Sequence, residues 1–306
     1  MRYLLWLFAF VLPLFATGEN QRNSDIWGVA RITNINLYDS GFAPLWLELQ
    51  GKGYFAYALA ILVLAVIVAF TLHYIIVGAK VFSHHGQKIY VFNAITRAMH
   101  ALAAISWMIL VPTGAIMMWG ESFGGGAFVR FCKNAHGIAT IVFCICVLPL
   151  FFGWLKRMLP KLYDIKWALV LGGYLSKEKR PVDSGKFNMG QKSWFWVAIP
   201  GGVLMIITGA SMYFMDFGAG YIFGISQIEY LRACALIHNA LGVLCAVFFL
   251  IHLYMVLFVI KGAIGAMIHG YKEEEEIYIL HHHWYKELRK KGKIERSKYE
   301  DTYGTL

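Results

Sequence analysis

The hydrophobic pattern divides the chain into five long apolar runs separated by polar stretches. The runs occupy about residues 54–79, 98–119, 134–155, 193–215 and 233–260. A helix needs about 20 apolar residues to cross a hydrocarbon core of about 30 Å, and each run is long enough to do so. The pattern therefore predicts five membrane-spanning helices. We expect a kink in the second helix at Pro112–Thr113–Gly114.

A shorter apolar stretch precedes these runs at the N-terminus. Residues 1–18 combine Arg2, a short apolar middle and small residues just before Glu19, which is typical of a secretory signal peptide. An uncleaved membrane anchor fits the same pattern. Residues 19–53 are polar and mixed, so they predict an exported, mostly non-helical segment.

Basic residues gather in three of the polar stretches: after the first run, between the third and fourth runs, and after the fifth. Because Lys and Arg accumulate on the cytoplasmic side of membrane proteins, these stretches are expected in the cytoplasm. The loops at about residues 120–133 and 216–232 carry little net charge and are expected outside. This topology gives the chain a periplasmic N-terminus and a cytoplasmic C-terminus.

Composition supports the same class of protein. Hydrophobic residues make up 58% of the chain and charged residues only 15%, whereas soluble domains carry roughly 25% charged residues. The net charge of +10 falls in short stretches between apolar runs, where it sets orientation in the membrane. We therefore expect contact with membrane lipid and no nucleic-acid partner.

The fifth run contains two histidines, His238 and His252, fourteen residues apart with no charge between them. Fourteen helical residues advance by about 1,400°, which leaves the second imidazole about 40° from the first, on the same face. They also rise by about 21 Å, most of the way across the hydrocarbon core. Since an imidazole in lipid is costly without a partner, both histidines are functional candidates.

Two further histidines complete a pattern of depth. By the expected topology, His100 lies at the cytoplasmic start of the second run, level with His252, and His136 lies at the outer start of the third run, level with His238. Two pairs at two depths are what two bis-histidine b haems require. The alternative is that these histidines are hydrogen-bond partners between helices, as single membrane histidines often are.

The other histidines and the cysteines have simpler interpretations. His73 has no partner left at its depth and is expected to be structural. His84, His85 and His281–His283 lie in polar stretches and are expected at a solvated or partner-facing cytoplasmic surface, with a metal site as the alternative. His269 follows the fifth run and is expected at the surface. The five cysteines are expected to pack as small apolar residues, with a Cys132–Cys234 disulfide as the alternative.

Several segments resemble the b-type cytochrome (gamma) subunit of respiratory formate dehydrogenase. The likeness covers about residues 95–290. Its segments are TRAMH at 96–100, NAHGI at 134–138, GKFNMGQK at 185–192, LIHNALG at 236–242, LIHLYM at 250–255, VIKGAIGAMI at 259–268 and HHWY at 282–285.

The resemblance implies a fold, cofactors and partners. It implies a four-helix bundle in the inner membrane that holds two haem b groups, the inner one between His100 and His252 and the outer one between His136 and His238. It also implies menaquinone reduction beside the inner haem, with contacts from Asn188, Gly190 and Gln191. Electrons would come from a periplasmic molybdenum- or tungsten-containing catalytic subunit through an iron–sulfur subunit. A higher oligomer of such a complex is also possible.

The asparagine and the glutamine of this loop can hydrogen-bond a quinone carbonyl without adding charge. The flanking Lys186 and Lys192 are expected to act as orientation charges, with proton delivery as the alternative.

The expected fold is thus an all-α integral membrane protein, a four-helix di-haem bundle plus one additional N-terminal transmembrane helix. Its expected parts are a signal peptide (1–18), an exported segment (19–53), the extra helix and a cytoplasmic linker (54–94), the di-haem bundle (95–270) and a cytoplasmic tail (271–306). One alternative function is the cytochrome b subunit of a hydrogenase or of a thiosulfate or polysulfide reductase. A remoter one is a five-span transporter, which the lack of a carboxylate within a span disfavours.

Overall fold

The computed structural model describes residues 41–215, 220–294 and 298–303. Within them, five helical spans are long and apolar enough to cross a membrane, as the sequence predicts. They are Tyr54–Ile76, Ala94–Met118, Gly126–Met158, Met189–Phe214 and Gln227–Val259. The expected signal peptide and residues 19–40 of the expected exported segment lie outside the described residues.

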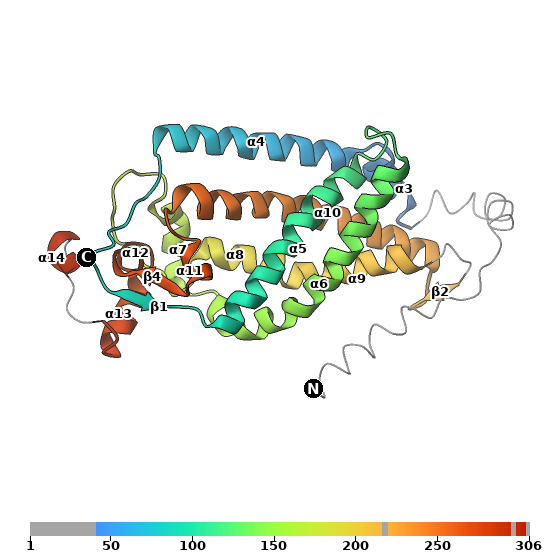
Figure 1. The fold of residues 1–306 in the computed structure, drawn as a ribbon. Coiled ribbons are helices and arrows are strands. Elements are labelled where there is room, and N and C mark those ends of the chain that lie inside the picture. The colour runs from blue at the N-terminus through green and yellow to red at the C-terminus, as the bar shows by residue number, and fades with distance from the viewer. Residues whose placement is uncertain (1–40, 216–219, 295–297, 304–306) are drawn as a thin grey trace, which may run out of the picture. The chain divides into compact units, whose positions relative to one another are not determined.

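The described elements follow one another along the chain as Figure 1 shows. In order, they are α3 (Ala43–Trp46), η3 (Leu47–Gly51), α4 (Tyr54–Ile76), β1 (Lys88–Tyr90), α5 (Ala94–Met118), α6 (Gly126–Met158), α7 (Leu162–Leu169), η4 (Leu171–Gly173), α8 (Met189–Ala198), α9 (Pro200–Phe214), β2 (Tyr221–Ile222), β3 (Ile225–Ser226), α10 (Gln227–Tyr254), η5 (Met255–Val259), α11 (Gly265–Ile268), β4 (Tyr271–Glu273), α12 (Glu274–Leu280), α13 (His282–Lys290) and α14 (Lys298–Tyr303).

These elements form two compact units. One unit contains the described residues up to Leu59 together with Gly201–Leu244, and the other contains Ala60–Pro200 and the described residues from Cys245 onward. The boundary falls inside α4 and α10 and after the first residue of α9, so α4 and α10 each contribute substantially to both units.

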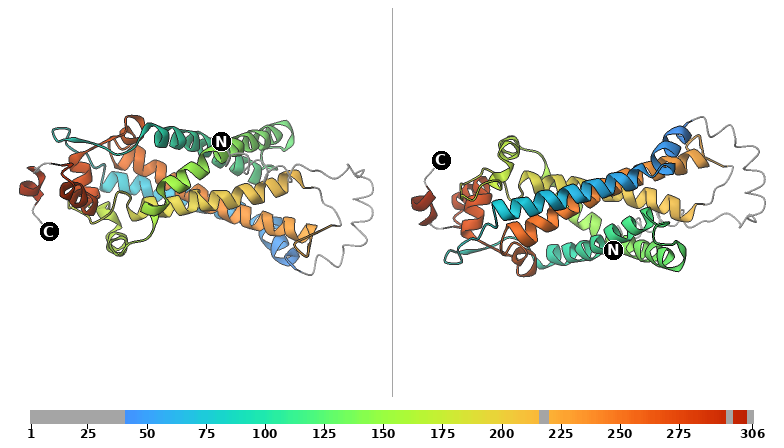
Figure 2. Two further views of the ribbon diagram at one scale, coloured as in Figure 1. Left: turned by 90° about the horizontal axis from the view of Figure 1, so that it is seen from below. Right: turned by 90° about the horizontal axis from the view of Figure 1, so that it is seen from above.

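In the larger unit, α5 and α6 run alongside each other as a helical hairpin (Figures 1 and 2). Asn93 caps the start of α5, because its side chain accepts a hydrogen bond from the backbone N–H of Thr96. The turn between the two helices contains three consecutive glycines with positive φ, Gly124–Gly126, a conformation that other residues rarely adopt. The helix α5 continues through Pro112 without ending.

The extra helix α4 contacts the end of α10 through aromatic and polar side chains of the larger unit. His73 Nδ1 lies 2.6 Å from the Tyr254 hydroxyl, and His73 Nε2 lies 2.9 Å from the Tyr174 carbonyl. Phe70 stacks on Tyr254 with ring centroids 4.0 Å apart. Both nitrogens of His73 therefore have partners within the protein, which agrees with the structural role expected of it.

The segment after α10 folds back onto the polar end of the larger unit. Strand β4 pairs antiparallel with β1, and Lys88 lies opposite Glu273. The backbone at Val182 and Ser184 hydrogen-bonds residues 279–284. The side chains of Ile277–Leu280 are almost completely buried. The expected tail thus contains a packed apolar core.

In the smaller unit, two short helices precede α4. The helices α3 and η3 together cover Ala43–Gly51, so the last part of the expected exported segment is helical. Pro44 occupies the first turn of α3, where it removes no helical hydrogen bond. The Phe42 backbone N–H donates to a Glu229 carboxylate oxygen at 2.5 Å, and Asn239 donates to Gln50. These contacts fix the helical segment to α10.

The expectation for two histidines is wrong: His281 and His282 are buried at 1% and 6% exposure rather than lying at the surface. The five cysteines are free and four of them are buried, which agrees with the expected packing role and not with the alternative of a Cys132–Cys234 disulfide. The expected surface position of His269 is confirmed. The span α6 begins at Gly126, eight residues before its predicted start, because the residues of the expected outer loop continue the helix.

The buried His281 makes the docking of this segment sensitive to pH. Its Nδ1 donates to the Gly185 carbonyl at 2.8 Å, and burial, with the charge of Lys272 adding to the effect, lowers the His281 pKa to about 3. The unfolded segment therefore binds a proton more readily than the folded one, and the stability of docking falls as pH drops below about 6.5. For one group, the loss approaches about 1.4 kcal/mol per pH unit.

Hydrogen exchange of residues 277–285 at pH 7.5 and pH 5.0, corrected for intrinsic rates, measures this loss. We expect a lower opening free energy at pH 5.0. The variant His281→Asn is the control, because its amide can still donate to the carbonyl but does not titrate. Equal opening free energies at both pH values in the unmodified protein would contradict the prediction.

Candidate functional site

His100 and His252 lie close together in the larger unit. His100 is in the second turn of α5, and His252 is in the last turn of α10. Their ring centroids are 6.4 Å apart, and the ring planes meet at 60°. Two imidazoles on opposite sides of one metal ion have centroids roughly 6 Å apart, because each metal–nitrogen bond is about 2 Å long. The separation of these two rings fits bis-histidine ligation.

Two tryptophans pack against this histidine pair. Trp194 of α8 stacks on the His252 ring with centroids 5.7 Å apart and an angle of 23°. Trp154 of α6 lies 6.3 Å from the His100 ring. The two tryptophan rings restrict the rotation of the two imidazoles and add a flat apolar surface beside them.

The other two candidate ligands, His136 of α6 and His238 of α10, have matching local surroundings. The Thr113 hydroxyl of α5 lies 2.9 Å from His136 Nδ1. The Thr208 hydroxyl of α9 lies 3.1 Å from His238 Nδ1. Each histidine is therefore held by a threonine on a neighbouring helix within its own unit.

The hydrogen-bond geometry fixes the protonation of both rings. The Thr113 hydroxyl donates its only proton to the Ile109 carbonyl at 2.6 Å, and the Thr208 hydroxyl donates to the Leu204 carbonyl at 2.8 Å. Each threonine oxygen must then accept a hydrogen bond from the imidazole Nδ1–H. The proton on Nδ1 leaves the Nε2 lone pair of both histidines available to a metal.

A glycine follows each of these threonines and lies against the same ring. A Cβ at Gly114 would lie 3.4 Å from His136 Cε1, and a Cβ at Gly209 would lie 3.0 Å from His238 Cε1. The second distance is shorter than ordinary van der Waals contact, so a side chain there would displace the imidazole. In each Thr–Gly pair, the glycine thus allows the helix backbone to approach the histidine closely, and the threonine holds the imidazole ring.

All four candidate histidines are half-buried. Half-burial suits side chains whose exposed edge would be covered by a flat prosthetic group, and neutral imidazoles are suitable axial ligands for haem iron. The residues present therefore fit haem b. The pairing of His136 with His238 stays a prediction, because the two residues belong to different units.

The residues that position these histidines were not predicted from the sequence. Thr113 and Thr208 were not assigned a role, and neither were Trp154 and Trp194. One signal was present: the dipeptide Thr–Gly occurs in both the second and the fourth runs. It did not reveal which histidine each threonine would contact.

The loop expected to contact a quinone leads into α8 and forms a capping box. The Asn188 side chain accepts from the Gln191 backbone N–H at 2.9 Å, and the Gln191 side chain accepts from the Asn188 backbone N–H at 3.0 Å. Asn188 is only 4% exposed, whereas Gln191 is half-buried. The Gln191 side-chain amide is therefore the better placed of the two for donating to a ligand.

Gly190 has a packing role in the same loop. A Cβ at this position would lie 3.2 Å from the ring of Trp167 in α7. Glycine thus allows the first turn of α8 to pack closely against α7. The backbone at Gly190 is exposed, so a ligand can still reach it.

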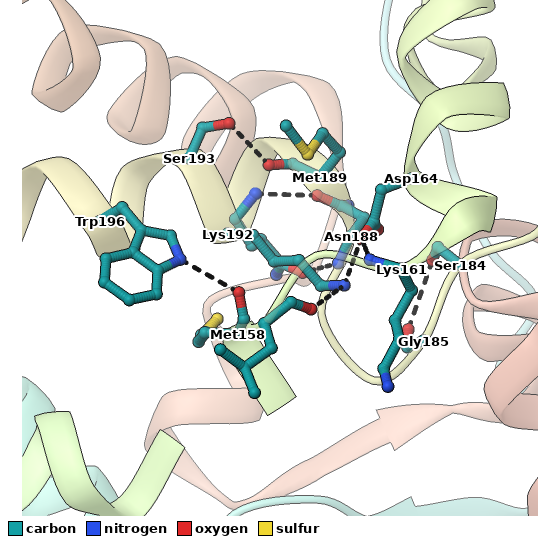
Figure 3. Close-up of polar contacts among 12 residues, drawn as sticks. Met158, Lys161, Asp164, Ser184, Gly185, Asn188, Met189, Lys192, Ser193 and Trp196 are labelled. Carbon is teal, nitrogen blue, oxygen red and sulfur yellow. Dashed lines mark hydrogen bonds and ion pairs between the residues drawn. The ribbon is translucent and has the colours of Figure 1, made fainter. Parts of the chain in front are cut away.

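Lys192 forms a buried ion pair beside this loop. Its ammonium lies 2.6 Å from a carboxylate oxygen of Asp164, and both side chains are at most 4% exposed. Figure 3 shows this pair between Lys192 and Asp164. Lys192 also donates to the Leu159 carbonyl at 3.1 Å. Breaking a pair of this kind costs about 3–5 kcal/mol. The pair joins α7, α8 and the end of α6, so Lys192 has a structural role beyond that of an orientation charge.

Lys186 occupies an aromatic niche on the other side of the loop. Its ammonium donates to the Val91 carbonyl at 2.6 Å and lies 4.6 Å from the Phe92 ring centroid. Burial, and then the charges of Arg157 and Lys272, lowers the Lys186 pKa to about 8. This lysine can therefore exchange a proton near neutral pH, which a pure orientation charge would not do.

Comparison with known proteins assigns a family to the part of the chain that contains the second to fifth spans. A family model described as prokaryotic cytochrome b561 matches residues 91–270. The match includes all four candidate haem ligands and the capping-box loop. It begins after α4, so the first span lies outside the matched range.

Individual relatives carry related names. The cytochrome b556(Fdn) subunit of the nitrate-inducible formate dehydrogenase of Escherichia coli K12 is 29% identical over 203 residues, which cover 64% of this chain and 89% of that protein. The cytochrome b556(fdo) subunit of the same organism is 29% identical over 161 residues, 53% of this chain and 73% of that protein. The formate dehydrogenase cytochrome b556 subunit of Haemophilus influenzae is 26% identical over 191 residues, 59% and 78% of the two chains. The resemblance found in the sequence is thereby confirmed.

The two threonines give a test of the predicted pairing of His136 with His238. Replacing Thr113 or Thr208 by valine removes the acceptor for Nδ1–H, so the imidazole becomes a weaker donor to iron and the haem potential rises. We expect a rise of up to roughly 60 mV, the equivalent of one hydrogen bond in a one-electron couple. Potentiometric titration of the haem-loaded protein measures it.

If His136 and His238 share one haem, Thr113→Val and Thr208→Val shift the same component of the titration. Thr140→Val is the matched control, because the Thr140 hydroxyl bonds only a backbone carbonyl of the same helix, that of His136. Shifts in two different components would show that the two histidines do not share a haem.

Proposed function

Because the chain belongs to the prokaryotic cytochrome b561 family, we propose that it is the membrane-spanning di-haem subunit of a formate dehydrogenase complex. In this role it passes electrons from formate oxidation at the periplasmic side to menaquinone at the cytoplasmic side. The observation that carries the proposal is the 6.4 Å separation of the His100 and His252 rings, which fits two axial ligands of one iron.

Four histidines would hold two haem b groups. His100 and His252 would ligate the inner haem, and His136 and His238 the outer one. Haem b with two axial imidazoles takes up and releases single electrons and leaves no coordination site for oxygen or substrate. The chain itself orients the ligands: threonines bind the Nδ1 atoms of His136 and His238, and tryptophans pack against the other two rings.

In the proposed topology, electrons cross the membrane in one direction, from the periplasmic to the cytoplasmic side. Because basic residues favour the cytoplasmic side, the capping-box loop and the C-terminal segment would lie on the cytoplasmic side of a bacterial inner membrane. His238 and His252 are separated by about 21 Å along α10, so the two ligand pairs would lie near opposite membrane surfaces. Protons would be released outside by formate oxidation and taken up inside by the quinone, which builds a membrane potential.

Menaquinone would be reduced beside the inner ligand pair, next to Asn188, Gly190 and Gln191. In the capping box, the side-chain oxygens of Asn188 and Gln191 already accept hydrogen bonds. A quinone carbonyl would therefore accept a hydrogen bond from the Gln191 side-chain amide or from the exposed backbone at Gly190. Lys186, whose pKa burial lowers to about 8, lies two residues before Asn188 and can supply a proton.

The donor is inferred from the names of the relatives. Three of them are described as formate dehydrogenase subunits, which favours formate over hydrogen, thiosulfate or polysulfide as the electron source. The partners would be a periplasmic molybdenum or tungsten catalytic subunit and an iron–sulfur subunit. A transporter is disfavoured because the matching family is one of cytochromes.

The variant His252→Ala tests the assignment of the inner haem. Pyridine haemochrome analysis of the purified complex should fall from about two haem b per chain to about one, because one iron loses an axial ligand. Quinone reduction should be lost, while formate oxidation with an artificial dye on the catalytic subunit remains.

His73→Gln is the matched control for this experiment. It removes a histidine from a span but retains an amide that can bond the Tyr254 hydroxyl. The control should keep both haems. If His252→Ala also kept both haems and reduced quinone, the ligand assignment would be wrong.

A second experiment tests the loop. Gln191→Glu keeps the side-chain oxygen that accepts from Asn188 N–H, and so keeps the capping box, but it replaces the amide donor by a carboxylate. We expect at least about tenfold weaker inhibition by a quinone analogue, since an anionic acceptor repels a carbonyl oxygen. Haem content should not change.

The control is Ser193→Ala in the next turn, whose hydroxyl bonds only the Met189 carbonyl. Inhibition of this control should match that of the unmodified protein. Unaltered inhibition of Gln191→Glu would remove Gln191 from the quinone site.

A further inference from the structure

A recess of about 540 Å³ lies just beyond the end of the extra helix α4 in the larger unit. It combines Ala79–Ser83, which follow α4, with Lys177, Lys179 and Glu275 from two distant parts of the chain. The family match begins at residue 91, so one wall of the recess lies outside the matched range. The proposed electron path uses none of these residues.

Lys80 is the most buried of the three lysines that line the recess. It is 5% exposed, and its ammonium donates to the Ser176 and Glu178 carbonyls at 3.0 and 2.9 Å. These bonds use two of its three protons, and neither partner carries a charge. Burial, with the neighbouring charge of Lys179, lowers the Lys80 pKa. An anion beside this ammonium would offset the cost of burying its charge.

The other charged residues leave the recess positive. Lys179 pairs with Glu275 at 2.8 Å, and the same carboxylate accepts from the Ser83 backbone N–H and from the Tyr303 hydroxyl. Lys177 is exposed and has no ion pair within the described part of the chain. Three lysines therefore line the recess with a single carboxylate, which already accepts three hydrogen bonds.

Exposed apolar side chains adjoin the lining residues along the chain, and one of them, Val81, lines the recess itself. Ile75 and Ile76, the last residues of α4, are 73% and 64% exposed, and Val81 and Leu175 are 58% and 64% exposed. The helix α4 has the highest mean hydropathy of the five spans, 2.7, and only 6% of its most apolar window is buried within the protein. Lipid chains would therefore lie against α4 up to the point where the lysines begin.

We propose that this recess binds the phosphate headgroup of an anionic phospholipid whose acyl chains lie along the end of α4. A basic pocket at the cytoplasmic end of a membrane span is where anionic headgroups concentrate. The apolar surroundings favour a lipid over soluble phosphate, since a free ion gains nothing from Ile75, Ile76 or Leu175. The bound headgroup would bridge the segment after α4 and the segment Ser176–Lys179.

Native mass spectrometry of the full chain in neutral detergent tests the proposal. Phosphatidylglycerol, phosphatidylcholine and inorganic phosphate are added in separate arms. We expect phosphatidylglycerol to remain bound at least about tenfold more often than phosphatidylcholine, and inorganic phosphate at equal concentration not to displace it. Equal retention of the two lipids, or displacement by phosphate, would overturn the proposal.

Two variants locate the site. Lys177→Gln changes an exposed residue, so its fold is preserved, and we expect about fivefold weaker retention of phosphatidylglycerol. Lys80→Gln should weaken retention at least as much, and its haem absorption spectrum checks that it is folded. Lys166→Gln is the control, because Lys166 is exposed on α7 but does not line the recess. Equal retention by Lys177→Gln and the control would refute the site.

Discussion

An imidazole inside an apolar helix is costly unless its polar nitrogens have partners, and the described spans are arranged around this constraint. Thr113 and Thr208 satisfy the Nδ1 atoms of His136 and His238 from neighbouring helices. Each threonine also binds a carbonyl of its own helix, which determines that the imidazole is the donor. A hydroxyl thus fixes the tautomer, and the glycine that follows it allows the close approach. The same chemistry prepares a nitrogen on each ring for a metal.

The polar end of the larger unit depends instead on contacts between buried charged and polar groups. Here charged and polar groups are buried together: Lys192 with Asp164, His281 with the Gly185 carbonyl, and Lys186 with an aromatic niche. Each of these three buried groups has a specific partner, and breaking such a contact is costly. The capping-box loop lies within this region, so its side chains are fixed before any ligand binds. The positive recess beyond α4 belongs to the same end.

The sequence predicted the five spans because hydropathy reports directly which residues can lie in lipid. It was less accurate at helix ends: α6 begins at Gly126 rather than near residue 134, because a helix continues into water as long as its backbone hydrogen bonds are satisfied. The interpretation of the C-terminal segment failed for another reason. His281 and His282 stand among polar residues and were expected at the surface, but their partners lie about a hundred residues earlier in the chain, around Val182–Gly185.

The sequence by itself determined the membrane class, the number of spans and the four candidate histidines, because apolar run length and helical period are local properties of the chain. Only the tertiary structure decided which side chains hold those histidines: Thr113, Thr208, Trp154 and Trp194 are contacts between separate helices. It also decided that Lys192 is paired and buried, and that the C-terminal segment contains a core. The physical reason is that burial and hydrogen bonding depend on residues distant in sequence, whereas hydropathy does not.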